Sequence, residues 1–139
     1  MDARMKTLAQ TCLEAAETGT MTFPQIVGAL SEGGFESYVV DYRRSTTTYY
    51  ATDGESVELR GPETAGEVAP RLDPEPLGDA IREAQTLAPG YTYLGFCTKA
   101  KLAGCAAYIV SFPGRRVLYF GRDAAAHVEH FPNRQLGET

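Results

Sequence analysis

The two histidines of the chain lie close together, in the segment His127-Val128-Glu129-His130. If this segment is a helix, side chains three positions apart lie on one face, so both imidazole rings could reach one metal ion. Asp123, one turn before His127, could add a carboxylate oxygen. The spacing is less specific than that of HExxH, and no third nitrogen or sulfur ligand is identifiable. We therefore predict no metal site, and His127 and His130 are the residues that would bind a metal if one were held here. The alternative is a structural role, in which His127 packs on a sheet edge and His130 is partly solvated in a terminal helix.

General acid–base chemistry would need a histidine or carboxylate beside a pocket, with neighbours that adjust its pKa. The best candidates are Asp41, Tyr42, His127 and Glu129, with Arg122 as a partner for Asp41. An acid that faces the core must be paired, because an unpaired buried charge is costly. A structural ion pair is thus the alternative to a catalytic role.

The three cysteines, Cys12, Cys97 and Cys105, form no CxxC pair. A nucleophilic thiol would need a histidine near it in space. We expect buried, reduced thiols instead, because free cysteine is among the most buried residue types. An odd count without an export signal favours a cytoplasmic location. The sequence contains no GxSxG, GxGxxG or GxxxxGK[ST] motif, so the corresponding hydrolase and nucleotide-binding loops are not expected.

Tyrosine is the most unusual part of the composition, with eight residues. Tyrosine prefers boundaries at which the ring is buried and the hydroxyl reaches water. One interpretation is an aromatic face that binds a partner chain or a flat ligand. The other, which we favour, is a core beneath helices. The aromatic residues concerned occupy alternate positions of the predicted strands, so their side chains could share one face of the sheet. They are Tyr38, Tyr42, Tyr49, Tyr108, Tyr119 and Phe112.

Arginines stand at two predicted hairpin turns, as Arg43-Arg44 and Arg115-Arg116. Solvated turns are the simplest explanation, and contact with an anionic partner is the alternative. Residues 53–83 carry a net charge of −6 and residues 84–139 one of +3, within a total of −5. The basic residues are scattered, whereas nucleic-acid binding requires a concentrated basic footprint. We do not expect nucleic acid as a partner.

Two similar series of elements must position these side chains. The segment Thr22-Phe23-Pro24-Gln25 is a capping box with proline in the first turn, and Gly33-Gly34 ends the helix that it begins. Asp53-Gly54 is a hairpin turn signal. Periodicity predicts helices over 3–18, 23–32, 77–87 and 92–103, a short helix over 124–130 begun by Asp123, and strands over 35–42, 46–52, 56–59, 105–112 and 117–122.

The chain reads as a single domain over 1–139, since its length suffices for one core. Residues 61–76 form an acidic, proline-rich connector within it, because prolines exclude a continuous helix or inner strand. Residues 133–139 are expected to fray. The predicted fold class is α+β, with about five mostly antiparallel strands and helices packed on one face.

A shift of 70 positions aligns residues 22–53 with 92–123, with 6 identities across 32 positions and no gap. Two of the identities are Tyr38 with Tyr108 and Gly34 with Gly104. An internal helix–hairpin duplication would give this pattern. Two units built by the same folding rules would also resemble each other.

Two sets of residues carry a resemblance to a known family. They are Thr22-Phe23-Pro24, Gly34, 38–42 and 48–51 in the first half, and Gly104-Cys105, 108–110, 119–122 and 127–132 in the second. Over about residues 5–132 the chain resembles the small bacterial YbcV-like family, labelled phage-envelope-like. The resemblance implies a compact α+β domain. It implies no activity, substrate or catalytic residue.

No apolar run approaches the roughly 18 residues that a membrane helix needs. The sequence therefore favours a cytoplasmic accessory or binding domain without catalysis or cofactor, whose partner is an unknown protein or small molecule. The chain could also form a homo-oligomer. The alternative is a small enzyme or ligand-binding protein with a site near Asp41, Arg122, His127 and Glu129. The candidate binding residues are Tyr38, Tyr42, Tyr49, Tyr108, Tyr119, Arg44, Arg115 and Arg116.

Overall fold

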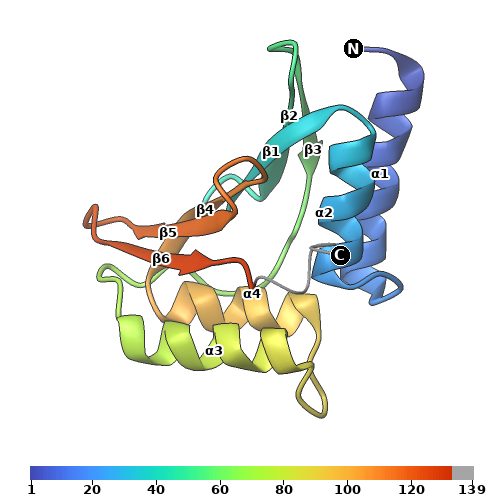
Figure 1. Ribbon diagram of the computed structural model, residues 1–139. Coiled ribbons are helices and arrows are strands. Elements are labelled where there is room, and N and C mark those ends of the chain that lie inside the picture. The colour runs from blue at the N-terminus through green and yellow to red at the C-terminus, as the bar shows by residue number, and fades with distance from the viewer. Residues whose placement is uncertain (133–139) are drawn as a thin grey trace.

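The computed structural model describes residues 1–132, which contain four helices and one six-stranded antiparallel sheet (Figure 1). The predicted α+β class is confirmed, with six strands where about five were expected. Residues 133–139, expected to fray, lie outside the described residues. The elements are α1 (Ala3–Thr18), α2 (Phe23–Glu32), β1 (Phe35–Asp41), β2 (Thr46–Ala51), β3 (Ser56–Arg60), α3 (Pro74–Thr86), α4 (Tyr93–Leu102), β4 (Cys105–Ser111), β5 (Arg116–Gly121) and β6 (Ala126–His130).

Side-chain caps fix where the first two helices begin. The Asp2 carboxylate accepts a hydrogen bond from the Met5 backbone N–H at 2.9 Å at the start of α1. The predicted capping box of α2 is present, since the Thr22 hydroxyl accepts from the Gln25 N–H and the Gln25 amide oxygen accepts from the Thr22 N–H. These bonds satisfy donors that the helix itself leaves without partners.

The strand order is β3-β2-β1-β4-β5-β6, so β1 and β4 meet at the centre and each half of the chain contributes three consecutive strands. We call the β1–β4 ladder the seam. In its middle Val39 lies opposite Ile109. On either side a tyrosine lies opposite a valine: Tyr38 opposite Val110, and Tyr108 opposite Val40.

The strands of the second half begin and end 70 residues after those of the first. The irregularities of the sheet recur at the same interval. A bulge separates Phe35 from Ser37 in β1, and another separates Cys105 from Ala107 in β4. The turn residues Ser45 and Arg115 both adopt positive φ, 53° and 51°. The two halves therefore share the positions of their bulges and of their positive-φ turn residues, as well as the positions of their strands.

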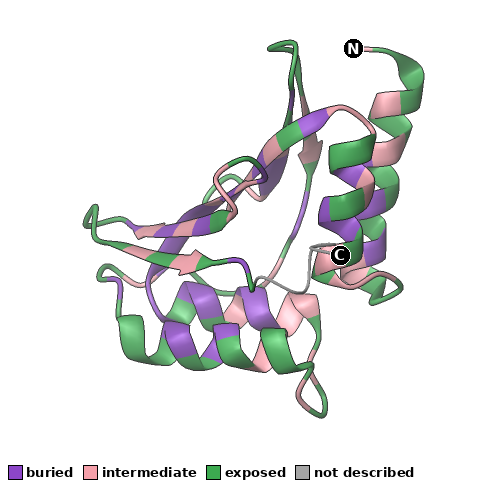
Figure 2. Ribbon diagram, in the orientation of Figure 1, coloured by how far each residue is buried: buried purple, intermediate pink, exposed green. Residues whose placement is uncertain are grey.

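Both helix pairs lie on the same side of the sheet (Figure 1), and the buried residues concentrate between the two layers (Figure 2). We call the sheet face toward the helices the inner face and the opposite one the outer face. Among residues 1–132, no helix combines the length and apolar character that a bilayer span requires. The inner face supplies much of the core, including Tyr38, Val40, Tyr49, Tyr108, Val110 and Tyr119.

The helix predicted over 124–130 is wrong, because residues 126–130 form β6 and pair with β5. Asp123 closes a turn by accepting from the Ala125 N–H at 3.2 Å, and Ala124 adopts a positive φ of 65°. The helix propensity of three consecutive alanines is overridden by the free edge of β5, since a paired strand satisfies backbone groups on both chains.

Helix α3 begins at Pro74, three residues before the predicted start, which shortens the connector to residues 61–73. Asp73 caps the helix by accepting from the Glu75 N–H at 3.2 Å. Pro74 and Pro76 lie in the first turn, where a missing N–H leaves no intrahelical hydrogen bond unmade. Pro74 and Pro76, which the sequence predicts to lie in the connector as residues that exclude a helix, therefore lie inside α3.

The connector is held against the second half of the chain. The buried Lys101 side chain donates from Nζ to the Thr64 carbonyl oxygen at 2.8 Å. Arg122 donates to the Val68 carbonyl oxygen at 3.1 Å, and Asp123 accepts from the Leu72 N–H at 3.2 Å. Side chains of α4 and of the turn after β5 thus satisfy backbone groups of a segment with no regular structure.

We predict that Gly104→Ala lowers the free energy of unfolding by about 3 kcal/mol or more. Gly104 has a φ of +90°, and a Cβ there would lie 1.8 Å from the Arg71 carbonyl oxygen, so the connector must move. Gly54 is the matched control, with a φ of +93° and nothing within 4 Å of its Cβ position. Gly54→Ala should cost about 1 kcal/mol. Equal losses in urea denaturation would show that the connector contact contributes little.

Candidate functional site

His127 and Glu129 are in direct contact on β6, with 2.8 Å between Nε2 and Oε2. The two residues are two positions apart on a strand, so their side chains lie on the same face, which here is the inner face. The ring of His127 lies 6.2 Å from that of Tyr119 on the neighbouring strand. Both polar side chains remain partly exposed, at 26% and 32%. They form an ion pair when the imidazole is protonated.

The two histidines cannot share a metal ion in the way that a helix would allow. Residues three apart on a strand face opposite sides of the sheet, so His130 lies on the outer face, opposite Arg116. Among residues 1–132 no group of three or more His, Cys, Asp and Glu side chains could hold a metal. The shared-face argument for His127 and His130 is therefore wrong, because it assumed a helix.

Asp41 and Arg122 do not join His127 and Glu129. Asp41 accepts from the backbone N–H groups of Arg43 and Arg44 at 3.0 and 3.1 Å, which fixes the β1–β2 turn. It lies on the outer face, across the sheet from the His127–Glu129 contact. Arg122 binds the connector at Val68 instead of forming the expected pair with Asp41. The predicted four-residue site is not assembled.

Two cavities lie at the α3–α4 pair. One, of about 180 Å³, is at the loop between the helices, where it is lined by Tyr91 and Thr92 and bordered by the Lys99–Glu83 ion pair. The other, of about 270 Å³, is lined by residues of both helices, among them Ala80 and Leu102. Both are smaller than the roughly 300 Å³ at which small-molecule sites begin. None of the four candidate acid–base residues lines either cavity.

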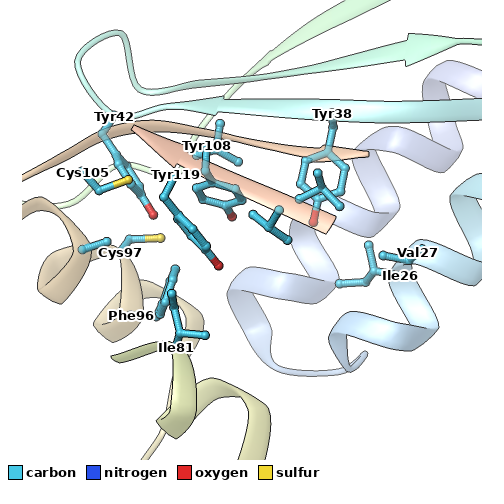
Figure 3. Close-up of a cluster of buried hydrophobic side chains, with 14 of the residues drawn as sticks. Ile26, Val27, Tyr38, Tyr42, Ile81, Phe96, Cys97, Cys105, Tyr108 and Tyr119 are labelled. Carbon is cyan, nitrogen blue, oxygen red and sulfur yellow. The ribbon is translucent and has the colours of Figure 1, made fainter. Parts of the chain in front are cut away.

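The five candidate tyrosines lie in the core, each between 3% and 8% exposed. Figure 3 shows the Tyr38, Tyr108 and Tyr119 rings directed from the sheet toward the helices. The Tyr108 hydroxyl lies 2.8 Å from that of Tyr93 on α4. Burial raises the pKa of the hydroxyls of Tyr38, Tyr42, Tyr49, Tyr108 and Tyr119. The structure therefore favours the core interpretation over an exposed aromatic face.

The cysteines are free and buried. Burial raises the pKa of Cys97 to about 11, although the neighbouring hydroxyls of Tyr42 and Tyr93 lower it in part. Burial raises the pKa of Cys105 to about 12 and also raises that of Cys12. Because the thiolate is the nucleophile, these environments oppose covalent chemistry at the thiols.

The arginine-bearing turns lie at opposite ends of the seam. Asp41, just before one turn, lies opposite Ala107 at the beginning of β4, while Ser111, just before the other, lies opposite Ser37 at the beginning of β1. Arg44 and Arg116 are exposed and Arg115 is half-buried. The candidate binding arginines therefore do not form one surface with the tyrosines.

Sequence reasoning missed an apolar row on the outer face. Val39, Ile109, Leu118 and Val128 lie directly opposite one another across β1, β4, β5 and β6. Val128 is 42% exposed and the other three are half-buried, and none belongs to the core cluster. The signal was the pair of adjacent apolar residues in each central strand, which places apolar side chains on both faces. We call these four residues the apolar row.

No protein-family model matches the chain, and no curated protein matches it either. The resemblance to the YbcV-like family stays a prediction.

We predict that a disulfide reagent such as DTNB finds no fast-reacting thiol in the native protein and three in denaturant. Two pKa units correspond to a hundredfold lower thiolate fraction, so native Cys97 should react at least about a hundredfold more slowly than a free thiol. Absorbance of the released thiolate measures the rate. A native thiol that reacts at the free-cysteine rate would restore the nucleophile hypothesis.

Proposed function

We propose that the chain is a non-catalytic protein-interaction domain that acts in the cytoplasm and binds its partner through the outer face of the sheet. The apolar row carries this proposal. Single apolar residues are common on protein surfaces, but a contiguous uncovered row marks interaction sites more often than a random surface does. Its register also matters, because directly opposed side chains form one continuous stripe.

The surroundings of the row suit a protein partner. Phe120 lies beside Leu118 on the same face of β5, and aromatic side chains are enriched in the centres of interfaces. Beyond the row, the same line across the sheet continues through Thr48 and Glu58, which are polar. An apolar centre with a polar margin is the usual anatomy of a protein interface.

The internal repeat supports specialisation of one half. We propose that residues 22–53 and 92–123 are duplicated units. Three inner-face positions of the central strands carry the same residue 70 positions later: Tyr38 and Tyr108, Val40 and Val110, and Tyr49 and Tyr119. Two outer-face positions change from polar to apolar between the halves, because Thr48 corresponds to Leu118 and Glu58 to Val128. On this proposal the shared framework serves folding and the second half serves binding.

The small-enzyme alternative has less support. Its remaining observation is the His127–Glu129 contact. A catalytic pair needs a neighbouring space that encloses substrate, and neither of the cavities at the α3–α4 pair is lined by His127 or Glu129.

The test is site-specific photo-crosslinking in lysate of the source cell, with a benzophenone amino acid at Ile109. Leu102, 70% exposed on α4, carries the same probe as a control. We expect one protein to crosslink at Ile109 and not at Leu102. Leu118→Lys should reduce that crosslink at least about tenfold, the ratio for 1.4 kcal/mol of binding, whereas Leu102→Lys should not.

Equal capture at both probe positions, or no capture at Ile109, would contradict the proposal. Circular dichroism of Leu118→Lys distinguishes a lost interface from a lost fold.

A further inference from the structure

We propose that the chain forms a two-fold dimer in which β6 pairs antiparallel with β6 of a second copy, centred on Val128. This inference goes beyond the binding role above. It concerns the edge of the sheet, and it holds or fails whether or not the outer face binds another protein.

The backbone of β6 has hydrogen-bonding groups that point away from β5 and could pair with a further strand. Among the described residues β6 pairs with β5 alone. The Phe131 N–H donates to the Arg115 carbonyl oxygen, and the Gly121 N–H donates to the Ala125 carbonyl oxygen, both at 2.9 Å. Because hydrogen-bonded pairs alternate in an antiparallel ladder, the N–H and C=O groups of three residues point away from β5. They are Ala126, Val128 and His130.

One register uses all of these groups. Pairing about Val128 sets it opposite the partner's Val128, with Ala126 opposite the partner's His130. All three outward-facing residues then lie in hydrogen-bonded pairs. The strand is flanked by a turn on one side and Pro132 on the other, so this register also matches the length of the free edge.

The inner-face side chains of β6 are self-complementary in that register. His127 lies opposite the partner's Glu129, and Glu129 lies opposite the partner's His127. These positions are non-hydrogen-bonded pairs, in which opposed side chains approach most closely. The two-fold axis makes the two contacts identical, as an isologous interface requires.

The outer-face side chain at the centre also fits a second copy. Val128, one of the most exposed large apolar residues, would be covered by the partner's Val128. The apolar row would continue through the axis into the partner's row. An unpaired edge strand with an exposed apolar side chain at its centre invites pairing with another chain, and the β6–β6 contact would satisfy it.

The other edge of the sheet does not offer this fit. The Gly61 N–H donates to the Ser45 carbonyl oxygen at 2.7 Å, which gives β3 the same alternation as β6. The centre of β3 is therefore Glu58, and self-pairing would set it opposite the partner's Glu58. Directly opposed like charges destabilise a strand pair. The geometry thus selects β6 and not β3.

The first test is sedimentation velocity of the purified full chain over a concentration series. We expect a monomer–dimer equilibrium with no larger species. Val128→Lys places two ammonium groups opposite each other and should raise the dimer dissociation constant at least about tenfold. Leu102→Lys introduces the same charge at a more exposed apolar residue and should leave the constant unchanged.

A charge exchange supplies a second, independent readout. His127→Glu sets glutamates opposite each other twice across the axis and should weaken the dimer on the order of tenfold. Adding Glu129→Lys to the same chain restores two opposite-charge pairs and should restore the dimer. His127 and Glu129 also contact each other within one chain, so urea denaturation of His127→Glu accompanies the assay. An unchanged free energy of unfolding together with a weakened dimer assigns the loss and its rescue to the interface.

A wild-type monomer at every concentration, a Val128→Lys dimer of unchanged affinity, or no rescue by the double variant would each overturn the proposal. Since the purified chain is tested alone, this result is independent of the crosslinking outcome at Ile109.

Discussion

The antiparallel seam between β1 and β4 is the constraint on which the rest of the structure depends. It joins two three-stranded halves into one sheet, and its register is symmetric about Val39 and Ile109. That symmetry brings both helix pairs to one face and sends the two hairpin turns to opposite ends. The opposed tyrosine and valine residues complete the seam, since each large ring lies opposite a smaller buried side chain on the inner face. As a direct result, no helix of residues 1–132 covers the outer face (Figure 1).

Most of the fold could be predicted because its signals are local. The capping box at Thr22 and the hairpin turn at Asp53-Gly54 are short-range interactions that operate in any tertiary context. β6 could not be predicted in this way. Its alanines and Asp123 favour a helix locally, and the strand arises because β5 has an unpaired edge. The equivalence of residues 126–130 with the strand at 56–60 was the available signal, and it is a comparison between distant segments.

The candidate site was less predictable than the fold because it depends on strand parity and on competing partners. Because side chains alternate between the faces of a strand, His127 and Glu129 lie on the same face of β6, whereas His130 lies on the opposite face. Asp41 has the chemistry of a general base, yet its carboxylate is used by backbone N–H groups two and three residues later. The apolar row was missed for a different reason, since it exists only when four strands are set in register.

Glu58 makes the two ends of the sheet unequal. A sheet that accepts a strand at both edges behaves as a bifunctional monomer does in step-growth polymerisation, and its assemblies lengthen without limit. With self-pairing at β6 as proposed, the central carboxylate at the β3 edge would make this chain a monofunctional monomer instead. In the proposed dimer, growth by self-pairing of strands would terminate after a single step, because the free β3 edge of each copy carries Glu58 at its centre.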